Sequence, residues 1–166
     1  SDADDPTPES AFIPRVKLDV DLGPSFYFRD AGADLQLTGI LHILREENQG
    51  LIGQGTINAY GVYEAFGTKL NIEQGLINFQ GSLSNPDLNI RAMTQNQEVE
   101  ASVEVTGNAN HPRVKLVSEP NVADEEKLSW LMFGKGSSDS DITQTQATSQ
   151  ALAAIGTYGG SKIAQQ

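Results

Sequence analysis

Several kinds of residue are absent or scarce in this chain, and each scarcity excludes a class of function. The 166 residues include no cysteine, which excludes disulfides, zinc–thiolate sites and thiol chemistry. Lysine and arginine number 11 against 22 acidic residues, and a net charge of −11 argues against binding nucleic acid or anionic lipid headgroups. No apolar run is long enough to span a bilayer. The acidity is best interpreted as a solubility feature.

Candidate catalytic and metal-binding residues are also few. The two histidines, His42 and His111, fall on a polar strand face and in a turn, so both are predicted to be surface imidazoles. Glu98, Glu100 and Glu104 share the polar side of one strand, where carboxylates commonly serve solubility. Asp139 and Asp141 lie in a Ser/Asp-rich segment without the glycine and distant glutamate of a calcium loop. The sequence therefore predicts no catalytic residue, metal or cofactor, and a protein that is not an enzyme.

Alternation of apolar and polar residues dominates the chain from residue 15 to residue 118. This period of two predicts roughly eight short antiparallel strands that form a sheet with one solvent-exposed face. A turn is expected near Gln74–Gly75, and helical spacing is absent from this stretch. The predicted fold is mainly β: a single antiparallel sheet curled into a trough, apolar inside and acidic or amide-bearing outside, plus one or two short C-terminal helices.

The apolar positions of these alternating strands define the candidate site, a hydrophobic groove for an apolar client. The residues predicted to line this groove are Leu35, Leu37, Leu41, Ile43, Leu51, Ile57, Leu70, Ile72, Ile77, Phe79, Leu88, Ile90, Val99, Val103, Val105, Val114 and Leu116. An alternative from another class is a closed β-sandwich with a filled core, acting as a scaffold or adhesion module.

Glycines on the apolar parity admit two interpretations. Gly39, Gly53, Gly55 and Gly61 either mark bulges and bends in the sheet or leave its inner face unfilled. The sequence does not separate these interpretations.

The period changes after Pro120. Leu128, Leu131 and Met132 at helical spacing predict a helix over residues 124–133, and a second helical stretch is expected from about Ile142. Trp130 and Phe133 form a neighbouring stripe, which is either a partner or membrane-interface surface or, as we favour, part of a helix that plugs one end of the apolar face. The expected division is a loose leader over 1–14, a trough domain with its closing helix over 15–134, and a linker with a second helical segment over 135–166, leading to a missing C-terminal part.

Three stretches together resemble a known family. They are residues 81–92 (GSLSNPDLNIRA), residues 103–107 (VEVTG) with 112–116 (PRVKL) and 118–120 (SEP), and residues 125–135 (EEKLSWLMFGK). In this order they are similar to the TamB C-terminal domain family, which belongs to the translocation and assembly module. The distinctive part covers roughly residues 75–135, and the strands before it are compatible.

The resemblance implies a function and a location. It implies a long periplasmic β-structure anchored in the inner membrane, an Omp85-type outer-membrane partner (TamA), and kinship with AsmA-like, bridge-like lipid-transfer proteins. The family has no catalytic residues to carry over. We therefore expect a soluble periplasmic segment that shields phospholipid acyl chains between the membranes in outer-membrane biogenesis. The alternative is a chaperone-like groove for unfolded outer-membrane β-barrel or autotransporter strands.

Overall fold

The computed structural model describes residues 13–65, 67–136 and 142–159 of the chain. Residues 1–12 of the predicted leader and residues 137–141 of the predicted linker lie outside these ranges. The account below concerns the described residues.

Within these residues the chain forms one open antiparallel sheet, as the alternation predicts. The strands are β1 (Val16–Asp21), β2 (Phe26–Asp30), β3 (Ala33–Arg45), β4 (Ile52–Ala65), β5 (Thr68–Ser82), β6 (Asp87–Thr94), β7 (Glu100–Asn108) and β8 (His111–Glu119). Their order in the eight-stranded sheet is β1-β3-β4-β5-β6-β7-β8, and β2 also pairs with β3. The sheet is not closed and no second sheet packs on it, so the closed-sandwich alternative is wrong for the described chain.

The turn expected near Gln74–Gly75 does not exist. These residues lie inside β5, where the register against β4 and β6 shifts at a β-bulge. A bulge inserts one residue and so reverses the parity of side chains along a strand. Even-numbered Leu70 and Ile72 therefore share a face with odd-numbered Ile77 and Phe79. The alternation broke here because of the bulge, and β5 looked like two short strands joined by a turn.

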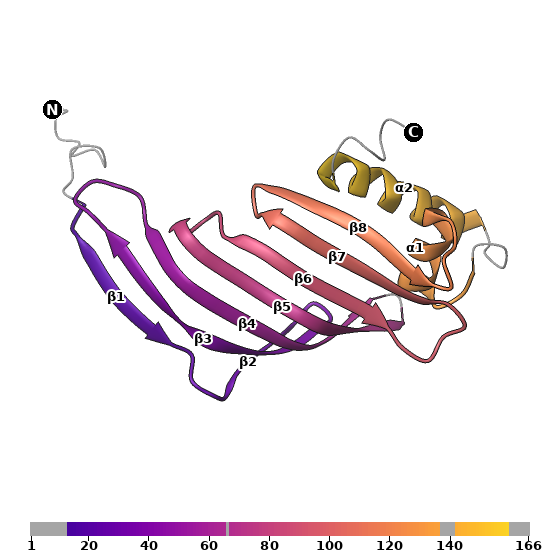
Figure 1. The fold of residues 1–166 in the computed structure, drawn as a ribbon, viewed down its shortest axis with the longest axis horizontal. Helices are drawn as coiled ribbons and strands as arrows, with labels where there is room; N and C mark the ends of the chain where they lie inside the picture. The colour runs from indigo at the N-terminus through magenta and orange to yellow at the C-terminus, as the bar shows by residue number, and fades with distance from the viewer. Residues whose placement is uncertain (1–12, 66, 137–141, 160–166) are drawn as a thin grey trace, which may run out of the picture.

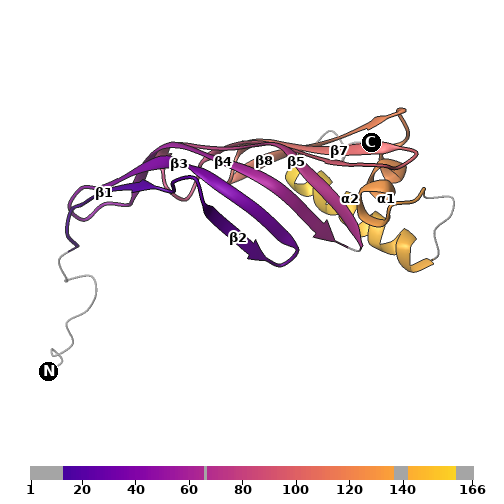
Figure 2. The same ribbon diagram turned by 90° about the horizontal axis from the view of Figure 1, so that it is seen from below.

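The sheet is curved, and both helices lie on one side of it. Figure 1 shows the strands side by side from β1 to β8, with the helices near β8. Figure 2 shows the helices beneath this end of the sheet and β2 on the same side.

Three glycines adopt a backbone conformation that other residues rarely adopt. Gly39, Gly55 and Gly61 each have φ of +136°, and a Cβ there would lie 2.2 Å from a backbone oxygen of the neighbouring strand. The register between β3 and β4 runs through all three glycines without a shift, so they meet a conformational requirement inside continuous strands. Gly53 differs, because a Cβ there would meet Leu83 Cδ1 at 2.8 Å, so Leu83 already fills its space.

Both predicted helices are present, as α1 (Asp124–Phe133) and α2 (Ile142–Gly159). Three acidic residues in the first turn of α1 interact favourably with the positive end of its helix dipole. The helix ends at Gly134, which takes a left-handed φ of +71° and donates its N–H to the carbonyl of Trp130.

The outer face of the sheet is less polar than expected. Ile40, Leu44, Ile52 and Tyr60 lie on the side opposite Leu41 and are between 39% and 52% exposed. The pairs Ile40–Leu41 and Ile43–Leu44 place apolar residues on both faces of β3, so strict alternation fails in this strand.

Candidate functional site

The apolar face is the side of the sheet that carries Leu41 of β3. Partnered residues on antiparallel neighbours point to the same side, so the register traces this face across the sheet. Leu41 lies opposite Val20 on β1 and Gly55 on β4, and Gly55 lies opposite Phe79 on β5. Further along, Ile77 pairs with Leu88, and Ile90 pairs with Val105. One continuous face therefore crosses all the strands.

Every predicted groove residue that lies in a strand is on this face. These residues are Leu35, Leu37, Leu41 and Ile43 on β3, Ile57 on β4, Leu70, Ile72, Ile77 and Phe79 on β5, Leu88 and Ile90 on β6, Val103 and Val105 on β7, and Val114 and Leu116 on β8. Leu51 and Val99 lie just outside the strands, Leu51 before β4 and Val99 before β7. The backbone carbonyl of Leu51 accepts from Leu83, and Val99 is buried beneath the helices. Whether these residues bind a client remains a prediction.

The two ends of the apolar face differ in what covers them. At the β7–β8 end, Val99, Ala101 and Leu116 are buried against helix residues such as Leu128 and Leu131, which form the hydrophobic core of the domain. At the β1–β2 end the same face is open: Leu18 is 51% exposed, Phe26 46% and Phe28 45%. Sequence periodicity identified the residues of the apolar face, but it did not indicate which end of that face the helices cover.

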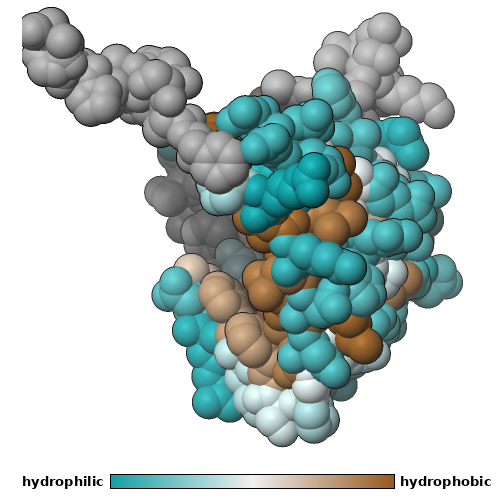
Figure 3. Space-filling model, turned by 90° about the vertical axis from the view of Figure 1, so that its left-hand side faces the viewer, coloured by the Kyte–Doolittle hydropathy of each residue, from teal (hydrophilic) through white to brown (hydrophobic). Residues whose placement is uncertain are grey.

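The open end can be followed in a space-filling view. Figure 3, seen from the left-hand side of Figure 1, shows apolar residues gathered in a band between hydrophilic ones. An isolated exposed leucine is ordinary on a protein surface, whereas a contiguous exposed apolar band is characteristic of interaction sites.

The Trp130–Phe133 stripe is divided between two environments. Trp130 is 8% exposed and belongs to the core cluster, which confirms that α1 plugs one end of the apolar face. Phe133 instead lines a polar hollow of about 620 Å³, with Glu64, Lys69 and Asn71 among the other residues of its wall. None of the predicted groove residues is among those that line this hollow.

Charged contacts in the described residues are isolated pairs, apart from Arg91, whose guanidinium lies near both Glu73 and Glu104. None resembles a catalytic or metal centre. His42 Nδ1 lies 2.6 Å from Asp19 Oδ1 across the β1–β3 pair, with both side chains more than half exposed. Arg91 Nη1 lies 3.2 Å from Glu104. No group of three or more His, Cys, Asp or Glu side chains that could hold a metal occurs in the described ranges. Sequence spacing missed both pairs because each joins separate strands.

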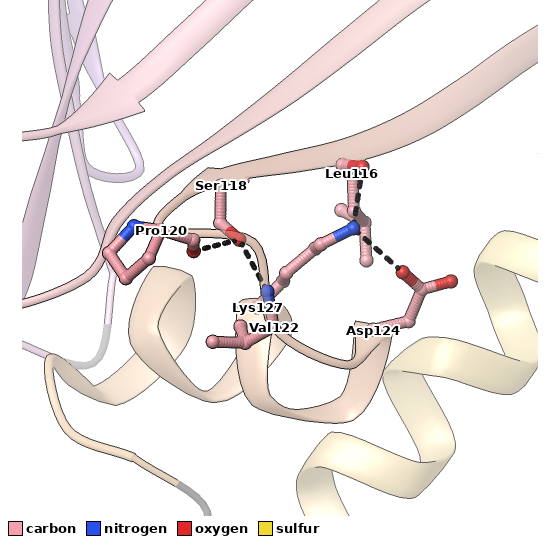
Figure 4. Close-up of polar contacts among 6 residues, drawn as sticks. All are labelled: Leu116, Ser118, Pro120, Val122, Asp124 and Lys127. Atoms are coloured by element: carbon pink, nitrogen blue, oxygen red, sulfur yellow. Dashed lines mark hydrogen bonds and ion pairs between the residues drawn. The ribbon is translucent and has the colours of Figure 1, made fainter.

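Several residues that carry the family resemblance form hydrogen bonds that connect neighbouring elements of the fold. Asn85 Oδ1 accepts the N–H of Asn110, and the Pro86 carbonyl accepts the N–H of Ala109, so the β5–β6 and β7–β8 turns are tied together. The joint between β8 and α1 is drawn in Figure 4: Ser118 donates its hydroxyl to the Pro120 carbonyl and accepts the N–H of Val122.

Lys127 fastens α1 to the sheet at the same joint. Its Nζ lies 3.4 Å from the carbonyl oxygen of Leu116 and 3.2 Å from Asp124 Oδ1 (Figure 4). The motif residues at these positions therefore connect the sheet to the closing helix.

Comparison with known proteins agrees with this architecture. Residues 1–166 match the model of the TamB C-terminal domain. Over 156 residues the chain is 31% identical to the translocation and assembly module subunit TamB of Haemophilus influenzae, an alignment that covers 90% of the chain and 12% of that relative. Neither described helix has the length and hydropathy needed to cross a membrane. This chain belongs to the TamB C-terminal domain family.

Proposed function

We propose that the apolar face of this domain shields phospholipid acyl chains from water as they pass between the inner and outer membranes. The observation that supports this most directly is the apolar face itself, which is continuous across the strands and stays exposed at Leu18, Phe26 and Phe28. Exposing an acyl chain to water costs about 0.8 kcal/mol per methylene. An extended apolar surface lowers that cost without binding tightly at any one point. This role involves no catalysis.

A polypeptide client is the second candidate, because the open sheet leaves strand edges free. The enclosure expected from the sequence would have hidden such edges, and the open sheet removes that argument. Two features of the β1–β2 edge still disfavour pairing with a client strand. Lys17, Asp19 and Asp21 place charges along β1, and Gly23–Pro24 interrupts the edge before β2. Charge, proline and short length are the usual protections of edge strands, so we favour lipid over strand addition.

The partner and location follow from the family and are part of the proposal. The relative from Haemophilus influenzae is named a subunit of a translocation and assembly module. We propose that the present domain acts within such a module in the periplasm, as part of an inner-membrane-anchored protein whose outer-membrane partner is of the Omp85 type (TamA). Because the chain spans 12% of that relative, the partner contact is assigned to other parts of the protein.

Adjacent residues on β3 provide a matched test. Leu41 lies on the apolar face, while His42 lies on the outer face and is exposed. We expect Leu41→Arg to lower binding of an NBD-labelled phosphatidylethanolamine by about tenfold, because the guanidinium interrupts the apolar surface that an acyl chain covers. His42→Arg introduces the same group one residue away, places it beside Asp19, and should bind the lipid as the parent does.

Mass spectrometry of small molecules that copurify with the domain supplies an independent test. Phospholipid recovered with the parent and depleted in Leu41→Arg supports the proposal. A parent that binds no labelled lipid and copurifies with none would overturn it. Binding of an unfolded outer-membrane β-strand peptide, with no lipid bound, would favour the second candidate.

A further inference from the structure

Helix α2 lies on the same face that we assign to the client. Its residues Ala151, Leu152 and Ile155 pack against the core cluster that contains Val99 and Leu116. Val99 and Leu116 belong to the predicted groove, and Figure 2 shows both helices on the same side of the sheet. The surface beneath α2 is therefore a continuation of the open apolar face rather than a separate core.

The two helices are held to the sheet by different kinds of contact. Helix α1 is tied by polar bonds, from Lys127 to the Leu116 carbonyl and from Thr68 of β5 to the Met132 carbonyl. Helix α2 contacts β8 and α1, and its residues in the core contact are apolar. Its sequence from Ile142 to Gly159 contains no charged residue. An acyl chain can replace the apolar contacts of α2, but it cannot replace the hydrogen bonds that hold α1.

One polar group in α2 opposes its burial. Thr148 is 5% exposed, and its hydroxyl has no hydrogen-bond partner among the described residues. A hydroxyl buried without a partner destabilises the buried state, because it is hydrogen-bonded to water when exposed. Thr148 therefore weakens the packing of α2 on the sheet.

We propose that α2 is a displaceable cover: it occupies the β8 end of the apolar face in the empty protein, and an acyl chain competes with it for that surface. The inference rests on the proposed lipid-shielding function and extends it, because it assigns the residues under α2 to the client path. Helix α1 stays in place as the fixed end of the domain. The open β1–β2 end then receives the chain first, and α2 yields as the chain advances.

Two substitutions in α2 should shift lipid affinity in opposite directions. Leu152→Ala removes part of the apolar contact of the cover, and we expect it to tighten binding of the labelled phospholipid about tenfold. Thr148→Val replaces the unpaired hydroxyl with a methyl group of similar size, which should strengthen the cover and weaken binding about fivefold. Ala154→Ser, on the exposed side of α2, is the control and should leave affinity unchanged. Equal affinity in all three variants would refute the cover.

The sole tryptophan of the 166-residue chain reports occupancy directly. Trp130 lies in the core cluster against which α2 packs. We expect a dibrominated stearate to quench Trp130 fluorescence, more strongly in Leu152→Ala and less in Thr148→Val, whereas unbrominated stearate should not quench it. Lipid binding without quenching would show that acyl chains stop at the open end, which overturns the cover and leaves the lipid-shielding function standing. If no lipid binds at all, the proposed function fails, and the cover fails with it.

Discussion

At the scale of single residues, Gly55 shows how the close pairing of β3 and β4 depends on the missing side chain. A Cβ at Gly55 would lie 2.2 Å from the Ile40 carbonyl oxygen, and its φ of +136° is unfavourable for any other residue. We expect Gly55→Ala to lower the free energy of unfolding by about 3 kcal/mol. Gly81, on the same face of β5, has open space around it, so Gly81→Ala should be neutral or stabilising by up to about 1 kcal/mol. Urea denaturation followed by circular dichroism measures both. Equal effects of the two substitutions would mean that the position of Gly55 tolerates a side chain.

Two acidic residues of β7 that look equivalent in the alternation have different surroundings. Glu104 lies 3.2 Å from Arg91 and is only 28% exposed, whereas Glu100 is exposed and lies opposite Glu119 on β8. Glu104→Lys should cost about 1–2 kcal/mol of unfolding free energy, because it breaks the ion pair with Arg91 and places a new cation between Arg91 on β6 and Lys115 on β8. Glu100→Lys removes a like-charge pair and should stay within about 0.5 kcal/mol of the parent.

Thermal unfolding at low and high salt separates these two cases. Salt should reduce the penalty of Glu104→Lys, since screening weakens the new repulsion between the introduced ammonium group and the Arg91 guanidinium. A Glu104→Lys protein as stable as the parent would show that the Arg91 pair contributes nothing.

At the scale of elements, periodicity predicted most of the fold for a physical reason. Each strand and helix buries one face, so the burial period appears in the sequence, as in β7 and α1. The prediction missed the bulge in β5, because a bulge changes the parity of side chains within one strand. It also missed the exposed Ile40 and Leu44 of β3, which do not follow the alternation. For the site, parity identified which residues share a face. The plug formed by α1 was predicted, but parity could not show which end it covers or that α2 packs there too, because contacts between elements distant along the chain leave no periodic trace.

The joint between β8 and α1 is the element-scale feature most open to test. Ser118 is 7% exposed, donates to the Pro120 carbonyl and accepts the Val122 N–H, so Ser118→Ala removes the side-chain partner of two part-buried backbone groups. We expect a loss of about 2 kcal/mol in unfolding free energy. Exposed Ser25, between β1 and β2, is the control, and Ser25→Ala should change stability by less than about 0.5 kcal/mol. A Ser118→Ala protein with parental stability in urea would show that the joint is held by other contacts.

At the scale of the whole molecule, one sheet face is used in two ways. Near β8 it is a core, closed by helices that bury Ala101 and Leu116. Near β1 and β2 it is a surface, with phenylalanines almost half exposed. A closed sandwich would have turned the entire face into core, and an uncovered sheet would have had too little buried area to be stable. The helices therefore stabilise the domain at one end, while the apolar face stays exposed at the other.

This division predicts opposite outcomes for the same substitution at the two ends. Leu116→Arg places a guanidinium beneath α1, where Leu116 is 7% exposed, and an unpaired buried charge there should cost more than about 4 kcal/mol and unfold the domain. Leu41 is half-buried on the open part of the face, so an arginine there can extend along the sheet and keep its charge in water. Leu41→Arg should therefore stay folded, with a loss of about 1–2 kcal/mol. Circular dichroism melts of the two variants test this, and the lipid-binding deficit of Leu41→Arg is interpretable only if that protein is folded. If Leu41→Arg unfolds as Leu116→Arg does, the face at β3 is sealed core, and the acyl-chain path across it is excluded.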